Sequence, residues 1–343
     1  SSALLEVLDP EQNKLFSDHY LEEPYDLSKV MFIATANYLD NIPAPLQDRL
    51  EIIELPSYTE LDKVHIAEEH LIPKQIKMNG LKPNQFKLKE KELLFLIRHY
   101  TREAGVRQLE RLIGSLCRKT VLAILNNDKK SVTVTEKLIK EWLGKEIFDY
   151  GVKEKKNQVG VVTGLAYTQF GGDVLSVEVN YFEGKGNLIM TGKLGDVMKE
   201  SAEIALDYVK AHAKEYDIDP KFFSSHEIHI QVPEGAVPKD GPSAGTIITT
   251  TILSYLLDKK IPNNVSMTGE ITLLGDVLPV GAIREKCYAA VKNNINIIFL
   301  SCENKRNVVK LEPVIKNKIK FIFVDNYKDI FDYLFKRGNK DER

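Results

Sequence analysis

A serine and a lysine lie in sequence contexts that favour covalent catalysis. Ser243 stands in Pro-Lys-Asp-Gly-Pro-Ser-Ala-Gly, residues 238–245, and Lys286 stands in Gly-Ala-Ile-Arg-Glu-Lys-Cys-Tyr, residues 281–288. Small residues let a substrate carbonyl approach the backbone, and a serine at a helix start lies beside unpaired N–H donors. Burial lowers the pKa of a lysine, which can then replace histidine as the base. The pattern predicts a Ser–Lys pair for acyl transfer.

Each of these residues also has an ordinary structural interpretation. A serine such as Ser243 often serves as a helix cap, and Lys286 taken alone fits an exposed charge on a helix surface. Thr268, in Met-Thr-Gly-Glu-Ile-Thr, has the hydroxyl that could orient the lysine, or is a plain turn residue. The context of small and apolar residues around the serine and the lysine favours the catalytic interpretation.

The segments around the pair predict a mixed sheet and helix architecture. Residues 243–257 form an apolar run that predicts a helix starting at the serine. Further helices are expected at 195–216 and 327–335. Strand-like runs occur at 159–168, 174–180, 187–191, 227–232, 297–300 and 319–324. This half of the chain is predicted to be α+β or α/β.

The first half has a different pattern. Residues 30–36 form an apolar run that predicts a buried parallel strand. Apolar residues then recur at helical spacing over 61–79, 90–103, 106–127 and 135–143, which predicts a small all-helical domain. Residues 148–158 are polar and aperiodic, and they are expected to form a linker or a solvated loop within one domain.

Composition narrows the class of protein. A chain of 343 residues fits two or three domains, and a formal charge of −2 gives no nucleic-acid or membrane-surface signature. The three cysteines form no C-x-x-C pair, and the histidines lack H-E-x-x-H spacing, so no metal site is predicted. We expect a soluble protein, because no apolar run reaches the roughly 18 residues of a membrane span. The missing initiator methionine suggests a fragment.

Three further residues have side chains suited to nucleotide sensing. Asn37 ends the predicted strand and is of a type that positions water, while Arg49 and Arg107 are of a type that stabilises phosphate charge. Taken singly, each is a weak signal that fits a solvated or capping residue better. The sequence has no G-x-x-x-x-G-K-[ST] loop, so it lacks the phosphate cradle that nucleotide hydrolysis requires.

Taken together, these segments resemble the ATP-dependent Lon proteases over nearly the whole chain. Residues 3–13 are similar to the family's segment after the Walker B strand, and 100–107 to its sensor-2 helix. Residues 195–201 and 233–236 are similar to stretches of its protease domain. The Pro-Lys-Asp-Gly-Pro-Ser form resembles the soluble subtype with a large N-terminal domain.

The resemblance implies a fold and a set of functional residues. It implies part of an AAA+ α/β subdomain at 1–57, a helical lid at 58–147, a linker at 148–158 and an α+β peptidase domain at 159–343. Ser243 corresponds to the nucleophile and Lys286 to the base. The residues implied as their neighbours are Thr268, Glu178 and Asp240, and those implied for nucleotide sensing are Asn37 (sensor 1), Arg49 (arginine finger) and Arg107 (sensor 2).

The resemblance also implies an activity, the ATP-dependent proteolysis of unfolded, damaged and short-lived regulatory proteins. It implies a homohexamer that uses ATP and Mg²⁺. The implied location is the bacterial cytoplasm rather than the mitochondrial matrix. This chain alone is expected to bind neither ATP nor Mg²⁺. Alternatives are a chaperone-like AAA+ module with a silent peptidase domain, and a weakly DNA-binding module.

Four positions depart from the family pattern. Ala282 replaces a second glycine and could crowd the turn before Lys286. The other three, Arg284, Leu274 and Gln231, bear on the fine tuning of the site rather than on its chemistry.

Overall fold

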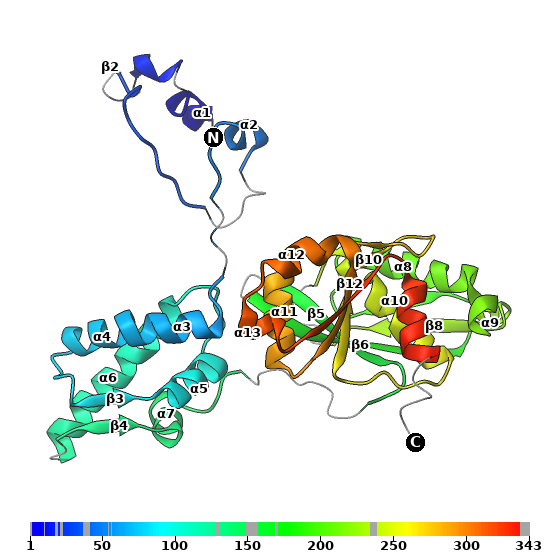
Figure 1. Cartoon of the computed structure of the whole chain (residues 1–343). Helices are drawn as coiled ribbons and strands as arrows, with labels where there is room; N and C mark the ends of the chain where they lie inside the picture. The colour runs from blue at the N-terminus through cyan, green and yellow to red at the C-terminus, as the bar shows by residue number, and fades with distance from the viewer. Residues whose placement is uncertain are drawn as a thin grey trace. The chain divides into compact units, whose positions relative to one another are not determined.

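The structure is a computed structural model that divides into two compact units, Ser1–Pro56 and Ser57–Arg343. It describes residues 2–9, 11–17, 20, 23–36, 42–53, 55, 57–127, 130–148, 157–168, 171–233 and 239–336 (Figure 1). The boundary between the units lies one residue before the expected end of the first domain. Within the described ranges, no helix is both long and apolar enough to cross a membrane.

The first unit has little regular structure in its described residues. Its helices are α1 (Ser2–Val7), the 3₁₀ turn η1 (Asn13–Leu15) and α2 (Ala44–Gln47), and β1 (Phe16–Ser17) pairs with β2 (Pro24–Tyr25). The strand expected at 30–36 is absent there, and Met31 and Ile33 are each 84% exposed. That prediction was wrong because a parallel strand needs neighbours, and the described residues of this unit supply none beyond the short β1–β2 pair.

Residues 57–148, here called the helical region, confirm the predicted helices. They contain α3 (Glu60–Ile66), the π-helical turn η3 (Ala67–Leu71), α4 (Ile72–Met78), α5 (Glu90–Tyr100), α6 (Arg107–Asn127) and α7 (Glu136–Leu143). Their apolar faces meet in one core that includes Leu93, Leu109 and Ile139. One element was not expected, the parallel pair of β3 (Phe86–Leu88) and β4 (Val132–Val134).

Residues 157–336, here called the sheet region, contain two main sheets and a hairpin. The four-stranded sheet has the order β5 (Val161–Thr168), β6 (Gly171–Glu183), β8 (His226–Gln231) and β7 (Leu188–Thr191). The three-stranded sheet is parallel, with the order β13 (Lys320–Val324), β12 (Ile297–Ser301) and β9 (Val265–Thr268). The hairpin joins β10 (Glu270–Ile271) to β11 (Val277–Leu278). This arrangement confirms a mixed α/β fold.

Three helices of the sheet region frame the predicted site, and Figure 1 labels each of them. α8 (Asp196–Ala211) packs on α10 (Gly245–Leu256), and α11 (Ile283–Lys292) packs on β5 and β6. Every residue of α10 from Gly245 to Ser254 is buried, so this helix lies inside the core. The remaining short helices are η4 (Ala213–Tyr216), α9 (Phe222–Ser225), η5 (Pro242–Ala244), η6 (Cys302–Asn304), α12 (Lys305–Val309), α13 (Pro313–Lys316), α14 (Tyr327–Phe331) and η7 (Asp332–Lys336).

The predicted boundary between the helical and sheet regions falls largely outside the described residues, because 149–156 are among those left out. The two regions form one compact unit, Ser57–Arg343. The proposed linker at 148–158 therefore stays a prediction.

Candidate active site

Ser243 lies in η5, immediately before the buried helix α10, and its half-buried side chain lines a cavity of about 880 Å³. The chain enters this turn through Gly241, whose φ of 122° suits glycine and few other residues. The Ser243 carbonyl oxygen accepts hydrogen bonds from Gly269 N at 3.1 Å and Thr268 Oγ1 at 3.4 Å. The turn that carries the serine is therefore fixed to the end of β9.

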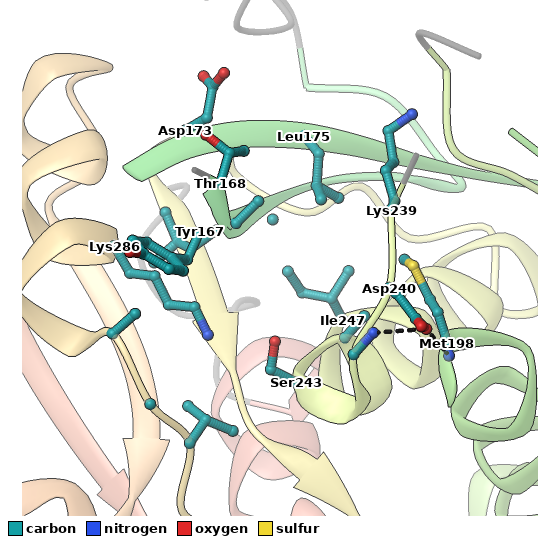
Figure 2. A pocket seen from close by; sticks show the side chains of 18 of the residues that line it. Tyr167, Thr168, Asp173, Leu175, Met198, Lys239, Asp240, Ser243, Ile247 and Lys286 are labelled. Carbon is teal, nitrogen blue, oxygen red and sulfur yellow. Dashed lines mark hydrogen bonds between the residues drawn. The ribbon is translucent and has the colours of Figure 1, made fainter. Parts of the chain in front are cut away.

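Lys286 reaches the same cavity from α11. It is 4% exposed, and its Nζ donates a hydrogen bond to Thr268 Oγ1 at 3.1 Å. Burial lowers the pKa of Lys286 from its ordinary 10.5 to about 8, because the charged form loses its hydration. Figure 2 shows the Lys286 nitrogen and the Ser243 hydroxyl directed toward one another across the cavity. The two side chains predicted as base and nucleophile thus face the same cavity.

Close backbone contacts set the position of both elements. A Cβ atom at Gly172 in β6 would lie 1.9 Å from the Glu285 carbonyl oxygen, so only a residue without a side chain lets β6 contact α11 here. A Cβ at Gly245 would lie 2.9 Å from Ile271 N and 2.8 Å from Ile271 Cγ2. The two glycines allow the lysine helix and the serine turn to approach the strands beside them.

Asp240 lines the cavity but makes its hydrogen bonds to backbone. Its Oδ1 accepts from Met198 N at 3.0 Å, in the first turn of α8, and from Gly241 N at 2.9 Å. Gly195 makes room for this carboxylate, since a Cβ there would lie 2.3 Å from Asp240 Cγ. Asp240 therefore ties the loop before Ser243 to the start of α8, as a capping carboxylate does.

The other predicted residues are not gathered at this cavity. Glu178 lies in β6 opposite Gln231 and is not among the cavity's lining residues. Arg49 pairs with Asp9 at 3.1 Å within the first unit, and Arg107 is the exposed first residue of α6. Asn37 lies outside the described residues. The nucleotide-sensing assignments remain predictions.

The departures from the family pattern have distinct positions. Ala282, the N-cap residue just before α11, adopts φ 55° and ψ 36°, the left-handed region. Its cost is therefore conformational, of the kind a glycine would avoid. Leu274 is 78% exposed on the turn of the β10–β11 hairpin and is absent from the cavity lining. Gln231, also exposed, ends β8.

Two cavity residues were missed by sequence analysis. Arg102, from the loop after α5, pairs with Asp173 of β6 at 3.1 Å, and both line the cavity. Ser201 of α8 was missed too; its hydroxyl donates to the Pro242 carbonyl oxygen at 3.2 Å. No local signal could reveal these contacts, because they join residues far apart in the chain.

The rest of the cavity lining is largely apolar and includes Leu165, Val174, Leu175, Met198, Ile247 and Val280.

Comparison with known proteins identifies the family of the chain. Residues 133–337 match the Lon protease (S16) C-terminal proteolytic domain, and residues 77–132 match the Lon protease AAA+ ATPase lid domain. The chain is 53% identical over 333 residues to Lon protease from Bacillus thuringiensis (strain Al Hakam), covering 97% of this chain and 42% of the relative. It is 50% identical over 340 residues to Lon protease from Mycoplasma mycoides, covering 99% and 43%.

A third relative, Lon protease 1 from Bacillus subtilis (strain 168), is 51% identical over 333 residues, which cover 97% of this chain and 43% of the relative. The chain thus spans less than half the length of these curated relatives. With one family domain matched over more than half of its residues and a second matched beside it, the chain belongs to the Lon protease family.

Proposed function

We propose that the sheet region hydrolyses peptide bonds with Ser243 as nucleophile and Lys286 as base. The observation that carries this proposal is the buried Lys286, with a pKa lowered by burial to about 8, facing Ser243 across the cavity. A neutral amine is needed to accept a proton from serine, and a pKa near 8 provides a substantial neutral fraction near physiological pH. The match to the S16 proteolytic domain supports the same chemistry.

The reaction proceeds through an acyl-enzyme. Neutral Lys286 takes the proton from Ser243 Oγ as the oxygen attacks the substrate carbonyl carbon. Backbone N–H groups near Ser243 stabilise the oxyanion. The Lys286 ammonium then gives its proton to the leaving amine. Water, deprotonated by Lys286, attacks the ester, and the proton returns to Ser243 Oγ as the acid product departs.

The apolar lining favours a substrate with an apolar side chain beside the scissile bond. Leu165, Val174 and Leu175 contribute to that lining, together with Ile247 of α10. Transfer of such a side chain from water is worth about 1.5–3 kcal/mol when it is fully buried.

For the longer protein to which this chain corresponds, we infer ATP-dependent degradation of unfolded and damaged proteins by a homohexamer. The support is the match to the AAA+ lid domain and the identity to bacterial Lon proteases. Arg49 and Arg107 would act on nucleotide there, and Asn37 would complete the sensor set. ATP and Mg²⁺ would be held mainly by segments that this sequence lacks, because it contains no phosphate loop. The bacterial relatives suggest the cytoplasm.

The silent-peptidase alternative has less support. Leu274 lies outside the cavity lining, and Ala282 occupies a left-handed conformation that alanine can adopt at a cost of about 1–2 kcal/mol. That cost is small beside the total stability of a domain.

A fluorogenic peptide assay tests the proposal. Ser243→Ala should abolish hydrolysis while leaving the melting temperature within about 2 °C, because one small hydroxyl is lost from a half-buried site. Ser115→Ala, which changes a half-buried serine of α6 in the helical region, is the matched control and should keep full activity. Undiminished hydrolysis by Ser243→Ala would refute the assignment of the nucleophile.

A further inference from the structure

One face of α11 contacts the helical region, while Lys286 on the same helix faces the cavity. Arg284, Tyr288 and Lys292 recur at four-residue intervals, so their side chains form one stripe along the helix. All three contact residues 57–62, which form the entry and first turn of α3. The helix that carries the candidate base therefore rests on the helical region along most of its length.

The strongest contact in this stripe is a buried ion pair. Lys292 Nζ lies 2.9 Å from Glu60 Oε1, and the two side chains are only 16% and 11% exposed. The other Glu60 oxygen, Oε2, accepts from Arg98 Nε at 3.0 Å and Nη2 at 2.9 Å. Glu60 thus joins α11 to α5. Burial raises the pKa of Glu60, but the charges of Lys292 and Arg98 lower it by more. The pKa of Glu60 is therefore below its ordinary value, and the carboxylate stays ionised at neutral pH.

Tyr288 and Arg284 extend the contact. Burial raises the pKa of Tyr288 to about 12, and its hydroxyl is hydrogen-bonded by the backbone of Glu60 and Leu61. Arg284 lies 3.6 Å from Asp62 and donates to the Ser57 carbonyl oxygen at 3.4 Å, in addition to a 2.6 Å ion pair with Glu312.

The α3 side of the contact is itself well defined. Asp62 and Thr59 form a reciprocal capping box at the start of α3, with hydrogen bonds of 2.8 and 3.1 Å. A capping box fixes the direction of a helix entry and the backbone N–H groups around it. The surface that receives the Arg284, Tyr288 and Lys292 stripe is therefore a fixed one.

α11 needs such support. It has ten residues, fewer than an isolated helix requires in water, and its N-cap residue, Ala282, offers no side-chain acceptor to its first N–H groups. Its orientation therefore depends on packing. β6 contacts it closely at Gly172, and the α3 turn contacts the stripe on another face.

We propose that the first turn of α3 is a positioning element for the candidate catalytic base: the Glu60–Lys292 pair, with Tyr288 and Arg284, holds α11 so that Lys286 faces Ser243 and Thr268. This rests on the peptidase function proposed above. Glu60 and Lys292 are positioning residues, since they act on the reaction through the orientation of α11. The helical region thereby controls the geometry of the base.

The test measures peptide hydrolysis against pH in the whole chain. Lys292→Met and Glu60→Gln should each lower kcat at least tenfold, with KM changed less than twofold. Each should also move the rising limb of the kcat profile to higher pH, because a loosened α11 admits water to Lys286 and relieves the burial that lowers its pKa. Lys292→Arg keeps the charge and should retain kcat within about threefold.

The paired design separates positioning from other effects. A purely through-space charge effect would move the limb in opposite directions, upward for Lys292→Met and downward for Glu60→Gln. Simple destabilisation would lower kcat without moving the limb, and melting curves would reveal it. Lys91→Met, which removes a 78% exposed lysine paired with Glu136, is the matched control and should change nothing.

Two outcomes are decisive against the proposal. A wild-type chain without peptidase activity would overturn the function on which the inference rests. An active wild type whose folded Lys292→Met and Glu60→Gln variants keep kcat and the pH limb would overturn the inference alone.

Discussion

Lys286 Nζ donates a hydrogen bond to Thr268 Oγ1 at 3.1 Å, while the single hydroxyl proton of Thr268 is directed to the Ser243 carbonyl oxygen at 3.4 Å. Because a threonine hydroxyl has one proton to donate, Thr268 can only accept from the lysine. The lone pair of the neutral amine is therefore left for the Ser243 hydroxyl. Thr268 thus joins Lys286 to the turn that carries Ser243.

Replacing Thr268 by valine should lower kcat about tenfold. Valine has a similar shape but makes neither hydrogen bond, and about 1.4 kcal/mol of lost orientation corresponds to that factor. Thr268→Ser keeps both bonds and should recover most of the rate. Thr120→Val, which removes a buried hydroxyl in α6, is the control and should leave kcat unchanged. A Thr268→Val enzyme as fast as wild type would show that the lysine needs no such partner.

Peptidase activity should rise with pH through about 8. Lys286 has its pKa lowered to that value by burial, and only its neutral form accepts the serine proton. Lys286→Arg should be inactive at every pH from 6 to 10, because arginine stays protonated. Lys292 also has its pKa lowered to about 8 by burial, so the rising limb should persist in Lys292→Met, displaced to higher pH as proposed above. A rising limb that is unchanged in position in every Lys286 variant would assign the base elsewhere.

Removing the buried amine should stabilise the fold. Because the pKa of Lys286 falls from 10.5 to about 8 on folding, keeping it charged at pH 7 costs up to about 3 kcal/mol. Lys286→Met should therefore raise the free energy of unfolding at pH 7.

The stability gained by Lys286→Met should depend on pH. Below pH 8 Lys286 is protonated in both the folded and the unfolded wild-type chain, so the cost of burying its charge is fully present. Between about 8 and 10.5 the unfolded chain keeps the proton and the folded chain does not, so wild-type stability rises and the gain shrinks. Chemical denaturation at pH 7 and pH 10 measures this. A gain that is the same at both pH values would contradict the burial of a titrating lysine.

Ala282→Gly should stabilise the protein by about 1 kcal/mol. The left-handed backbone at Ala282 costs an L-residue about 1–2 kcal/mol, which glycine largely avoids despite its greater freedom in the unfolded chain. Ala289→Gly, in the interior of the same helix, should destabilise by a similar amount and serves as the control. A melting temperature lowered by Ala282→Gly would mean that the left-handed start is not strained.

The sequence predicts Ser243 and Lys286 as the candidate pair because the evidence for them is local. Ser243 lies among small residues ahead of an apolar helix, and Lys286 follows an apolar turn, so each can be identified from its neighbours in the chain. The long helices are predicted for the same reason, since their apolar residues recur at a fixed spacing.

The contacts that orient the pair could not be predicted in this way. Arg284 was noted as a departure from a family pattern, yet it contacts Asp62 and Glu312. The Arg102–Asp173 pair also joins distant parts of the chain. The apolar run at 30–36 shows the opposite error, because its composition suits a strand but its described residues have no sheet to join. The roles of all the candidate site residues, Glu178 and Asn37 included, remain predictions.

The uninterrupted burial of α10 has a consequence for how the two halves of the pair move. Backbone amides that are buried on every side exchange with solvent only when the whole domain unfolds, whereas a short, weakly capped helix such as α11 opens in smaller fluctuations. Ser243 would then be the stationary partner and Lys286 the adjustable one. Any signal that switches the proposed peptidase on or off would have a low-cost route through α11, with Ser243 left in place.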